Sequence, residues 1–250
     1  MKLMELITPA KDIETPIGAF VKGMAYEKDK KLTYKGKNIE ILGAGIEGTA
    51  YRLEDNPNVI KVMTSNKENL GKIPYLQYIL TLSKYAKENP YFPRVDRISE
   101  IPINPSEYNV VINNVHEKNP DVAQKFARTF ARYPLSKLIV FKMEPLVEFS
   151  QATREELLVL FQKMFGTEPT KQLSPNELRE EITKIIEKAV HGKYTADYLN
   201  QIKDPYLKNA ISLIKKVRAK TKAYVDIHRE NVMLRRTPYG LQLVITDPLV

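Results

Sequence analysis

The stretch Tyr224-Val225-Asp226-Ile227-His228-Arg229-Glu230-Asn231-Val232-Met233-Leu234 decides the fold. It places Asp226 and Asn231 five residues apart, just before a pattern of alternating apolar residues that crosses the turn sequence at 237–240 and ends at Asp247. This pattern predicts an antiparallel hairpin, which returns Asp247 beside Asn231. Their side-chain oxygens then converge, and oxygen atoms are the ligands that Mg²⁺ prefers.

Glycines near the N-terminus form a second motif, in which Gly43, Gly45 and Gly48 fit GxGxxG. In a dinucleotide-binding fold such a loop opens a helix. Here residues 49–53 and 59–63 read as strands, separated by the turn-forming residues 54–58. The sequence therefore predicts a glycine-rich hairpin, whose backbone N–H groups can approach nucleotide phosphates closely.

Lys61 interrupts the otherwise apolar strand predicted at 59–63. An unpaired ammonium would be costly if its head were buried, so an anion is expected beside it. The phosphates of a nucleotide would meet that need. The alternative is a lysine whose stem packs on the strand while its head reaches solvent.

The pattern of elements divides the chain into two parts. Residues up to about 101 are strand-rich with one helix at 73–85, and a strand at 138–143 connects to helices at 153–165, 175–190 and 205–222. The stretch 102–136 is an insertion of unknown role with a possible helix at 121–133. We expect an α+β fold with lobes at 1–143 and 144–250.

The amino-acid composition narrows the possible classes of protein further. The chain has 43% hydrophobic and 28% charged residues and no cysteine, which excludes disulfides and thiolate chemistry. No apolar stretch approaches the roughly 18 to 20 residues of a membrane span, so we expect a cytoplasmic protein with no membrane partner. The charge of +9 allows nucleic acid as a partner, but the lysines are spread out and do not favour it.

In this order, the glycine loop, strand lysine, helix, connecting strand, helices, Asp-x-x-x-x-Asn and hairpin aspartate resemble the protein-kinase-like superfamily. The likeness is closest to small serine/threonine protein kinases encoded by bacteriophages, at GAGIEGTAYRLEDNPNVIKV (43–62) and VDIHRENVMLRRTPYGLQLVITDPLV (225–250). The Asp-x-His-x-x-Asn form of the loop also resembles aminoglycoside and related small-molecule phosphotransferases.

The resemblance implies a bilobal fold that binds ATP and Mg²⁺ and transfers the γ-phosphoryl group to protein hydroxyls, in host proteins of the host cytoplasm if the chain is phage-encoded. It implies that the glycines cover the phosphates, that Lys61 holds the α- and β-phosphates, and that Asp226 orients the acceptor hydroxyl. Asn231 and Asp247 would carry Mg²⁺. By position, Met143 resembles the gatekeeper, and the backbone of Glu144 and Leu146 resembles the adenine-binding hinge. His228 either contacts the γ-phosphate or is a loop histidine bonded to backbone.

The chain departs from the kinase pattern in three places. The helix at 73–85 offers no mid-helix Glu for Lys61, and the nearest polar substitutes are Gln77 and Tyr78, with Glu68 as another source. The His-Arg that precedes a kinase catalytic aspartate is Tyr224-Val225 here, and three residues follow Asp247. We therefore expect a reduced, mainly helical C-lobe without an activation segment, and constitutive competence.

Three alternatives remain beside the protein kinase. A small-molecule phosphotransferase is suggested by Asp-x-His-x-x-Asn, and a pseudokinase by the missing helix Glu. A basic module that binds host protein or nucleic acid without catalysis is the third. The presence of Lys61, Asp226, Asn231 and Asp247 together argues against a pure scaffold.

Overall fold

The computed structural model describes residues 8–9, 24–26, 32–34, 37–44, 48–54, 56–65, 73–85, 88–102, 137–191 and 195–250. These residues form helices and mainly antiparallel strands, so the predicted α+β class is confirmed. The chain divides into two compact units: Met1–Gly71 with Val95–Pro145, and Lys72–Arg94 with Leu146–Val250. Apart from Pro102, the predicted insertion lies outside the described residues, together with its possible helix at 121–133.

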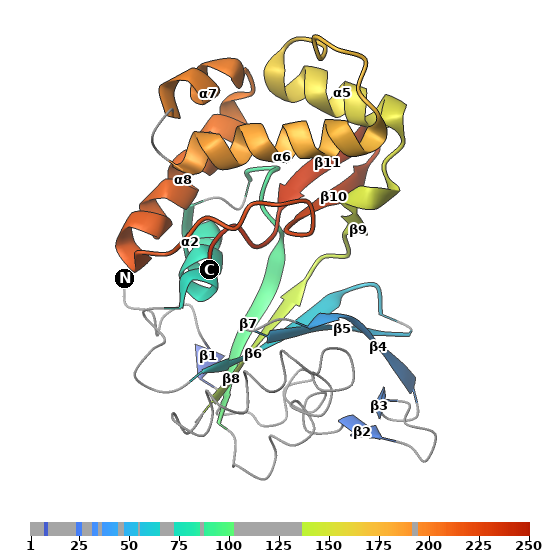
Figure 1. Cartoon of the computed structure of the whole chain (residues 1–250). Coiled ribbons are helices and arrows are strands. Elements are labelled where there is room, and N and C mark those ends of the chain that lie inside the picture. The colour runs from blue at the N-terminus through green and yellow to red at the C-terminus, as the bar shows by residue number, and fades with distance from the viewer. Residues whose placement is uncertain are drawn as a thin grey trace. The chain divides into compact units, whose positions relative to one another are not determined.

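The first unit is built on one sheet (Figure 1). Its five central strands are antiparallel in the order β7-β8-β6-β5-β4: Val95–Pro102, Lys137–Met143, Val59–Ser65, Gly48–Leu53 and Lys37–Ala44. Short strands extend both edges: β1 (Thr8–Pro9) runs parallel to β7, and β3 (Leu32–Tyr34) and β2 (Met24–Tyr26) follow β4.

The central strands β6 and β8 are apolar because both of their faces are covered. Val62 and Met63, which point to opposite faces of β6, are 1% and 0% exposed. The predicted turn before β6 is confirmed, because Oδ1 of Asn56 accepts from the backbone N–H of Asn58 at 3.0 Å. The predicted connecting strand is β8.

The second unit combines helices with a small sheet. Its helices are α2, α5, α6, α7 and α8, at Pro74–Tyr85, Arg154–Phe165, Pro175–His191, Thr195–Gln201 and Pro205–Thr221, with a 3₁₀ turn at Phe149–Gln151. The sheet has the order β11-β10-β9, with strands at Gly240–Ile245, Val232–Thr237 and Val147–Glu148.

Capping chemistry sets where α5 and α6 begin. The hydroxyl of Thr153 accepts from the backbone N–H of Glu156 at 3.2 Å, while the Glu156 carboxylate accepts from the Thr153 N–H at 2.8 Å. Ser174 and Glu177 make the same exchange at the start of α6. Both predicted starts are confirmed, whereas α7 is a short helix that the sequence pattern did not predict.

Apolar stripes on the helices form the core of this unit. The stripe predicted on α8 is buried at all five positions: Leu207, Ala210, Ile211, Ile214 and Val217. Each fully buried Leu or Ile side chain stabilises the fold by about 1.5 to 3 kcal/mol. Among the residues described, none of the helices combines the length and the apolar character that a membrane crossing needs.

Helix α2 belongs to the second unit, although the sequence division at 143/144 placed it in the first part. Its polar side chains explain the grouping. The buried hydroxyl of Tyr78 donates to the Ile245 carbonyl at 2.7 Å, and the Lys220 ammonium donates to Oε1 of Gln77 at 2.8 Å. The two residues considered as polar substitutes for a helix Glu are thus tied to β11 and α8.

Candidate active site

The backbone around Asp226 is held by the last residues of the chain. Helix α8 ends at Thr221, and the φ of 58° at its C-cap, Lys222, is the left-handed conformation that closes many helices. The chain then pairs antiparallel with residues 248–250: Tyr224 N–H donates to the Val250 carbonyl at 2.7 Å, and Asp226 N–H donates to the Pro248 carbonyl at 2.9 Å. This pairing fixes the position from which the Asp226 side chain projects.

The side chains of Asn231 and Asp226 form the centre of the site. The Nδ2 amide of Asn231 donates to the carbonyl oxygen of Asp226 at 2.7 Å and to its Oδ2 at 2.9 Å. None of the hydrogen bonds among the described residues uses Oδ1 of Asn231. The amide thus holds Asp226 with its donor end and keeps its acceptor end for another group.

The hairpin brings Thr246 and Asp247 to the same place. Strands β10 and β11 pair from Thr237 with Gly240 to Val232 with Ile245. Immediately beyond, the backbone N–H and the hydroxyl of Thr246 both donate to the Asn231 carbonyl at 2.9 Å, and the Asp247 N–H lies 3.5 Å from it. The structure therefore places Asp247 beside Asn231. The role of Thr246 was not predicted, and its only sequence signal is a hydroxyl directly before Asp247.

Both ring nitrogens of His228 lie close to polar groups of the same loop. Nδ1 accepts from the backbone N–H of Glu230 at 3.3 Å, while Nε2 lies 3.5 Å from Oδ1 of Asp226 and 3.1 Å from Nδ2 of Asn231. A neutral ring that accepts at Nδ1 carries its proton on Nε2, which then points its N–H at the Asp226 carboxylate and cannot accept from Asn231. The contact with Glu230 favours the backbone-bonded loop histidine, and the contact with Asp226 adds a second partner.

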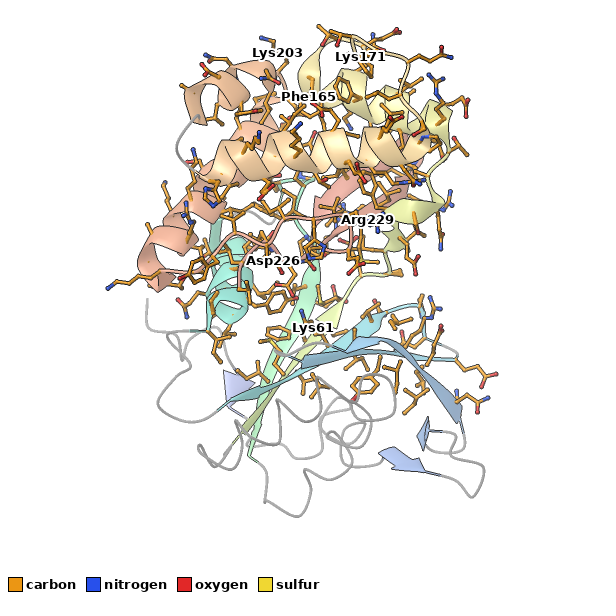
Figure 2. All side chains as sticks on the ribbon, viewed as in Figure 1. Lys61, Phe165, Lys171, Lys203, Asp226 and Arg229 are labelled. Carbon is orange, nitrogen blue, oxygen red and sulfur yellow. The ribbon has the colours of Figure 1, made fainter. Side chains whose placement is uncertain are left out.

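The side chains of the cluster are partly exposed to solvent. The side chains of Asp226 and His228 are 42% and 47% exposed. Asn231 and Asp247 are half-buried, and the neighbouring Arg229 is exposed. Figure 2 shows Asp226 and Arg229 on the loop between α8 and β10. A hydroxyl group can therefore reach the Asp226 carboxylate without unfolding of the loop.

The remaining predicted site residues that the structure describes belong mostly to the first unit. Lys61 sits in the middle of β6, opposite Ala50 of β5 and Phe141 of β8, and is half-buried. Gly43 and Gly48 lie in β4 and β5, whereas Gly45 is outside the described residues. Strand β5 begins at Gly48, so the glycine motif leads into a strand and the predicted hairpin arrangement is confirmed over the dinucleotide-binding one.

The predicted hinge lies at the end of β8. Met143 is the last residue of this strand, pairs with Val59 and Val95, and is 6% exposed. Glu144 and Leu146 follow in a segment without strand or helix, and the chain passes from the first unit to the second between Pro145 and Leu146.

Four of the predicted site residues belong to the second unit, where the structure brings them together: Asp226, His228, Asn231 and Asp247.

The oxygen donors of the cluster suit a hard cation. Asn231 Oδ1 and the Asp247 carboxylate are two oxygen ligands of the kind that Mg²⁺ takes, with water and phosphate oxygens completing its shell. Over the described ranges, no three His, Asp or Glu side chains gather as a ready-made metal site. Asn231 and Asp247 can therefore supply two of the oxygen ligands of a divalent cation.

No protein-family model matches this chain, and no curated protein sequence matches it either.

Proposed function

We propose that this chain is an ATP- and Mg²⁺-dependent phosphotransferase of the protein-kinase-like type, which transfers the γ-phosphoryl group to serine or threonine hydroxyls of proteins. One observation carries the proposal: Asn231 bonds to the carbonyl and carboxylate of Asp226, and its own carbonyl accepts from Thr246, directly before Asp247. A carboxylate and two metal-type oxygen donors within one hydrogen-bonded cluster are what phosphoryl transfer to a hydroxyl requires.

In the proposed reaction, the acceptor hydroxyl approaches Asp226, which orients it and takes its proton. The hydroxyl oxygen forms a bond to the γ-phosphorus, the bond from that phosphorus to the bridging β–γ oxygen breaks, and ADP leaves. Most of the rate comes from positioning and from neutralising charge. The exposure of the Asp226 side chain supports its part in this step.

The other residues have binding roles. Asn231 and Asp247 would hold Mg²⁺, which would supply positive charge to neutralise the phosphates of ATP. Lys61 binds the α- and β-phosphates, and the backbone N–H groups of Gly43, Gly45 and Gly48 cover them. The backbone of Glu144 and Leu146 would bind the adenine, with Met143 as the gatekeeper. If the chain is phage-encoded, the acceptor proteins are host proteins.

A small-molecule phosphotransferase is the second candidate. It is favoured by His228, whose Nε2 lies 3.5 Å from Oδ1 of Asp226 in the Asp-x-His-x-x-Asn loop. The chemistry at the phosphorus is the same in both cases, so the two candidates differ only in the acceptor.

The test is incubation with γ-labelled ATP and Mg²⁺, with a cell extract and with a panel of hydroxylated small molecules. We expect label in protein, and its loss in Asp226→Asn, where the amide cannot take the proton. The matched control is Asp197→Asn, an exposed carboxylate on α7. Label in small molecules only would support the second candidate. Absence of label from every acceptor, or full transfer by Asp226→Asn, would overturn the proposal.

A further inference from the structure

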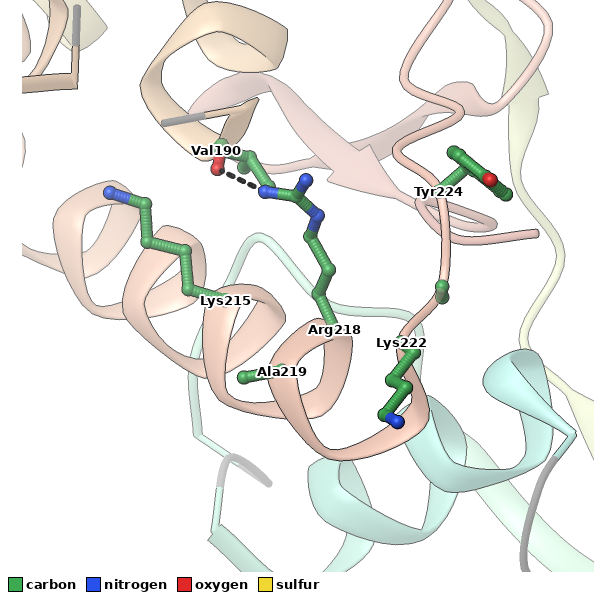
Figure 3. Close-up of a pocket in the computed structure, with 7 residues that line it drawn as sticks. Val190, Lys215, Arg218, Ala219, Lys222 and Tyr224 are labelled. Carbon is green, nitrogen blue, oxygen red and sulfur yellow. Dashed lines mark hydrogen bonds between the residues drawn. The ribbon is translucent and has the colours of Figure 1, made fainter. Parts of the chain in front are cut away.

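A basic groove lies at the end of α8. Tyr224, one of the residues that line it, precedes Asp226 by two positions in the chain. The volume of the groove is about 500 Å³, and its lining includes Lys215, Arg218, Lys222 and Tyr224. Figure 3 shows the three cations projecting from the last turns of α8 and its end, with Tyr224 on the chain segment that follows. Tyr224 is 79% exposed, which is unusual for a large aromatic side chain in a folded unit.

Residues 215–222 carry more positive charge than is needed to offset the dipole of α8. Residues 215–222 contain Lys215, Lys216, Arg218, Lys220 and Lys222, and no acidic residue. Cations near a helix C-terminus offset the helix dipole, each by about 0.3 to 1 kcal/mol, and this accounts for one or two of them. It does not account for Lys215, Arg218 and Lys222 all lining one groove beside an exposed aromatic ring.

Among the described residues, the groove cations have no acidic partner. Arg218 donates to the carbonyls of Val190 and His191 at 3.4 and 3.3 Å, which are neutral acceptors. Over the described part of the chain, none of the ion pairs involves Lys215, Arg218 or Lys222. Burial, and then the neighbouring Arg218, lower the pKa of Lys215. Neighbouring cations that repel one another are stabilised by an anion placed among them.

The position of the groove relates it to the candidate active site. Tyr224 and Asp226 lie on the same extended segment, which pairs with residues 248–250. Alternate residues of an extended chain project to the same side, about 6.6 Å apart. A ligand that contacts Tyr224 in the groove is therefore close to whatever reaches the Asp226 carboxylate.

We propose that this groove binds an acidic segment of the protein substrate, whose Asp or Glu side chains meet Lys215 and Lys222 when the neighbouring serine or threonine reaches Asp226. The proposal rests on the proposed function and narrows its substrate class to proteins with acidic residues near the acceptor. A nucleic-acid strand fits less well. A site for single-stranded nucleic acid extends along about 4 to 16 nucleotides, whereas the groove cations come from one short segment of the chain.

The test uses two fluorescent serine peptides that differ only in Glu or Gln around the acceptor, and the full chain without ATP. We expect the Glu peptide to bind about tenfold more tightly, as two partly exposed ion pairs allow. Lys215→Gln with Lys222→Gln removes this difference. The matched control is Lys208→Gln with Lys216→Gln, two exposed lysines of α8 outside the groove. The difference shrinks at high salt, because screening weakens exposed charge pairs.

A charge reversal excludes a merely structural effect. Lys215→Glu with Lys222→Glu should bind a peptide with Lys at the same positions more tightly than the Glu peptide, a gain that misfolding cannot produce. Equal binding of the Glu and Gln peptides to the unaltered chain would overturn the proposal. Tighter binding of a single-stranded oligonucleotide that requires the same two lysines would also overturn it. These readouts need no transfer, so a failure of phosphoryl transfer counts against the proposed function alone.

Discussion

The side-chain amide of Asn231 donates to both the carbonyl oxygen and the Oδ2 atom of Asp226, at 2.7 and 2.9 Å. The donor end of one amide therefore sets the direction of the carboxylate, while its acceptor end stays available for a cation. Under the proposed function, Asn231 couples the group that takes the acceptor proton to the group that holds Mg²⁺. A carboxylate in this place would have no donor, and a hydroxyl would have only one hydrogen for the two acceptor atoms of Asp226.

The first prediction concerns Asn231→Ala. Removing the amide releases the Asp226 carboxylate and deletes one oxygen ligand, so we expect phosphoryl transfer to fall about 100-fold or more. The concentration of Mg²⁺ needed for the half-maximal rate should rise as well, because the loss of an oxygen ligand weakens the binding of the cation. Initial rates over a Mg²⁺ titration measure both effects. Asn200→Ala, at an exposed position of α7, is the matched control. An unchanged Mg²⁺ requirement would remove Asn231 from the metal site.

The second prediction concerns Lys61→Met, which keeps the length of the side chain but removes its charge. If Lys61 binds the phosphates, affinity for ATP should fall about 10- to 100-fold, the value of a hydrogen bond to a charged group. Lys142→Met is the control. Lys142 lies opposite Ile60 in the register, so it points to the other face of the sheet, and it pairs with Asp96 at 3.4 Å. Calorimetric titration with ATP and Mg²⁺ measures the affinity, and equal values for the two variants would contradict the assignment.

Local chemistry is what the sequence predicted best. Thr153 with Glu156, and Ser174 with Glu177, start their helices where the spacing indicated, because each cap involves residues only three apart. The hairpin was predicted for the same reason: a turn sequence lies between two alternating strands, and the pairing of Val232 with Ile245 follows from it.

Partners far apart in the chain were not predictable. Tyr78 bonds to Ile245, 167 residues away, and Gln77 accepts from Lys220, 143 residues away. Nothing in the helix sequence indicates these partners, since an apolar stripe shows which face is buried but not against what. The short helix α7 was missed because its seven residues carry too little periodicity.

In the candidate site, too, some contacts were predictable from the sequence and others were not. The Asp226 and Asn231 contact depends on a spacing of five residues and was predictable, whereas the choice between the two roles of His228 was not. That choice depends on how the loop turns back, which the contact between Nδ1 and the Glu230 N–H reveals.

The third prediction concerns the pH dependence of stability through the cap of α6. Hydrogen bonds from the hydroxyl and the backbone N–H of Ser174 lower the pKa of the Glu177 carboxyl below its usual value of 4.5. A carboxyl whose pKa is lower in the folded state stabilises the fold above the unfolded value, and this stabilisation is lost as the pH falls through the folded value. Ser174→Ala should therefore lower the melting temperature at pH 7 and have a smaller effect at pH 3. Equal effects at the two values would show that the cap does not depend on the charge of Glu177.

The fourth prediction concerns Tyr78→Phe, which tests how α2 supports the end of β11. The Tyr78 ring is fully buried, and its hydroxyl donates to the Ile245 carbonyl at 2.7 Å. Burial, Tyr75 and the Asp247 carboxylate raise the pKa of Tyr78 well above its usual value, so the phenol remains a donor at any ordinary pH. The variant leaves the carbonyl without this bond and should lose about 1 to 3 kcal/mol of unfolding free energy.

The control is Tyr239→Phe at the exposed tip of the hairpin, where the ring is 98% exposed and no change is expected. Urea unfolding measures both variants. Because Ile245 is directly followed by Thr246 and Asp247, the loss of the Tyr78 bond should also loosen the segment that reaches Asn231. Hydrogen exchange at the amides of Thr246 and Asp247 should then rise in Tyr78→Phe before global unfolding does. If exchange at these amides follows global stability alone, α2 supports the core of the unit but does not position the candidate site.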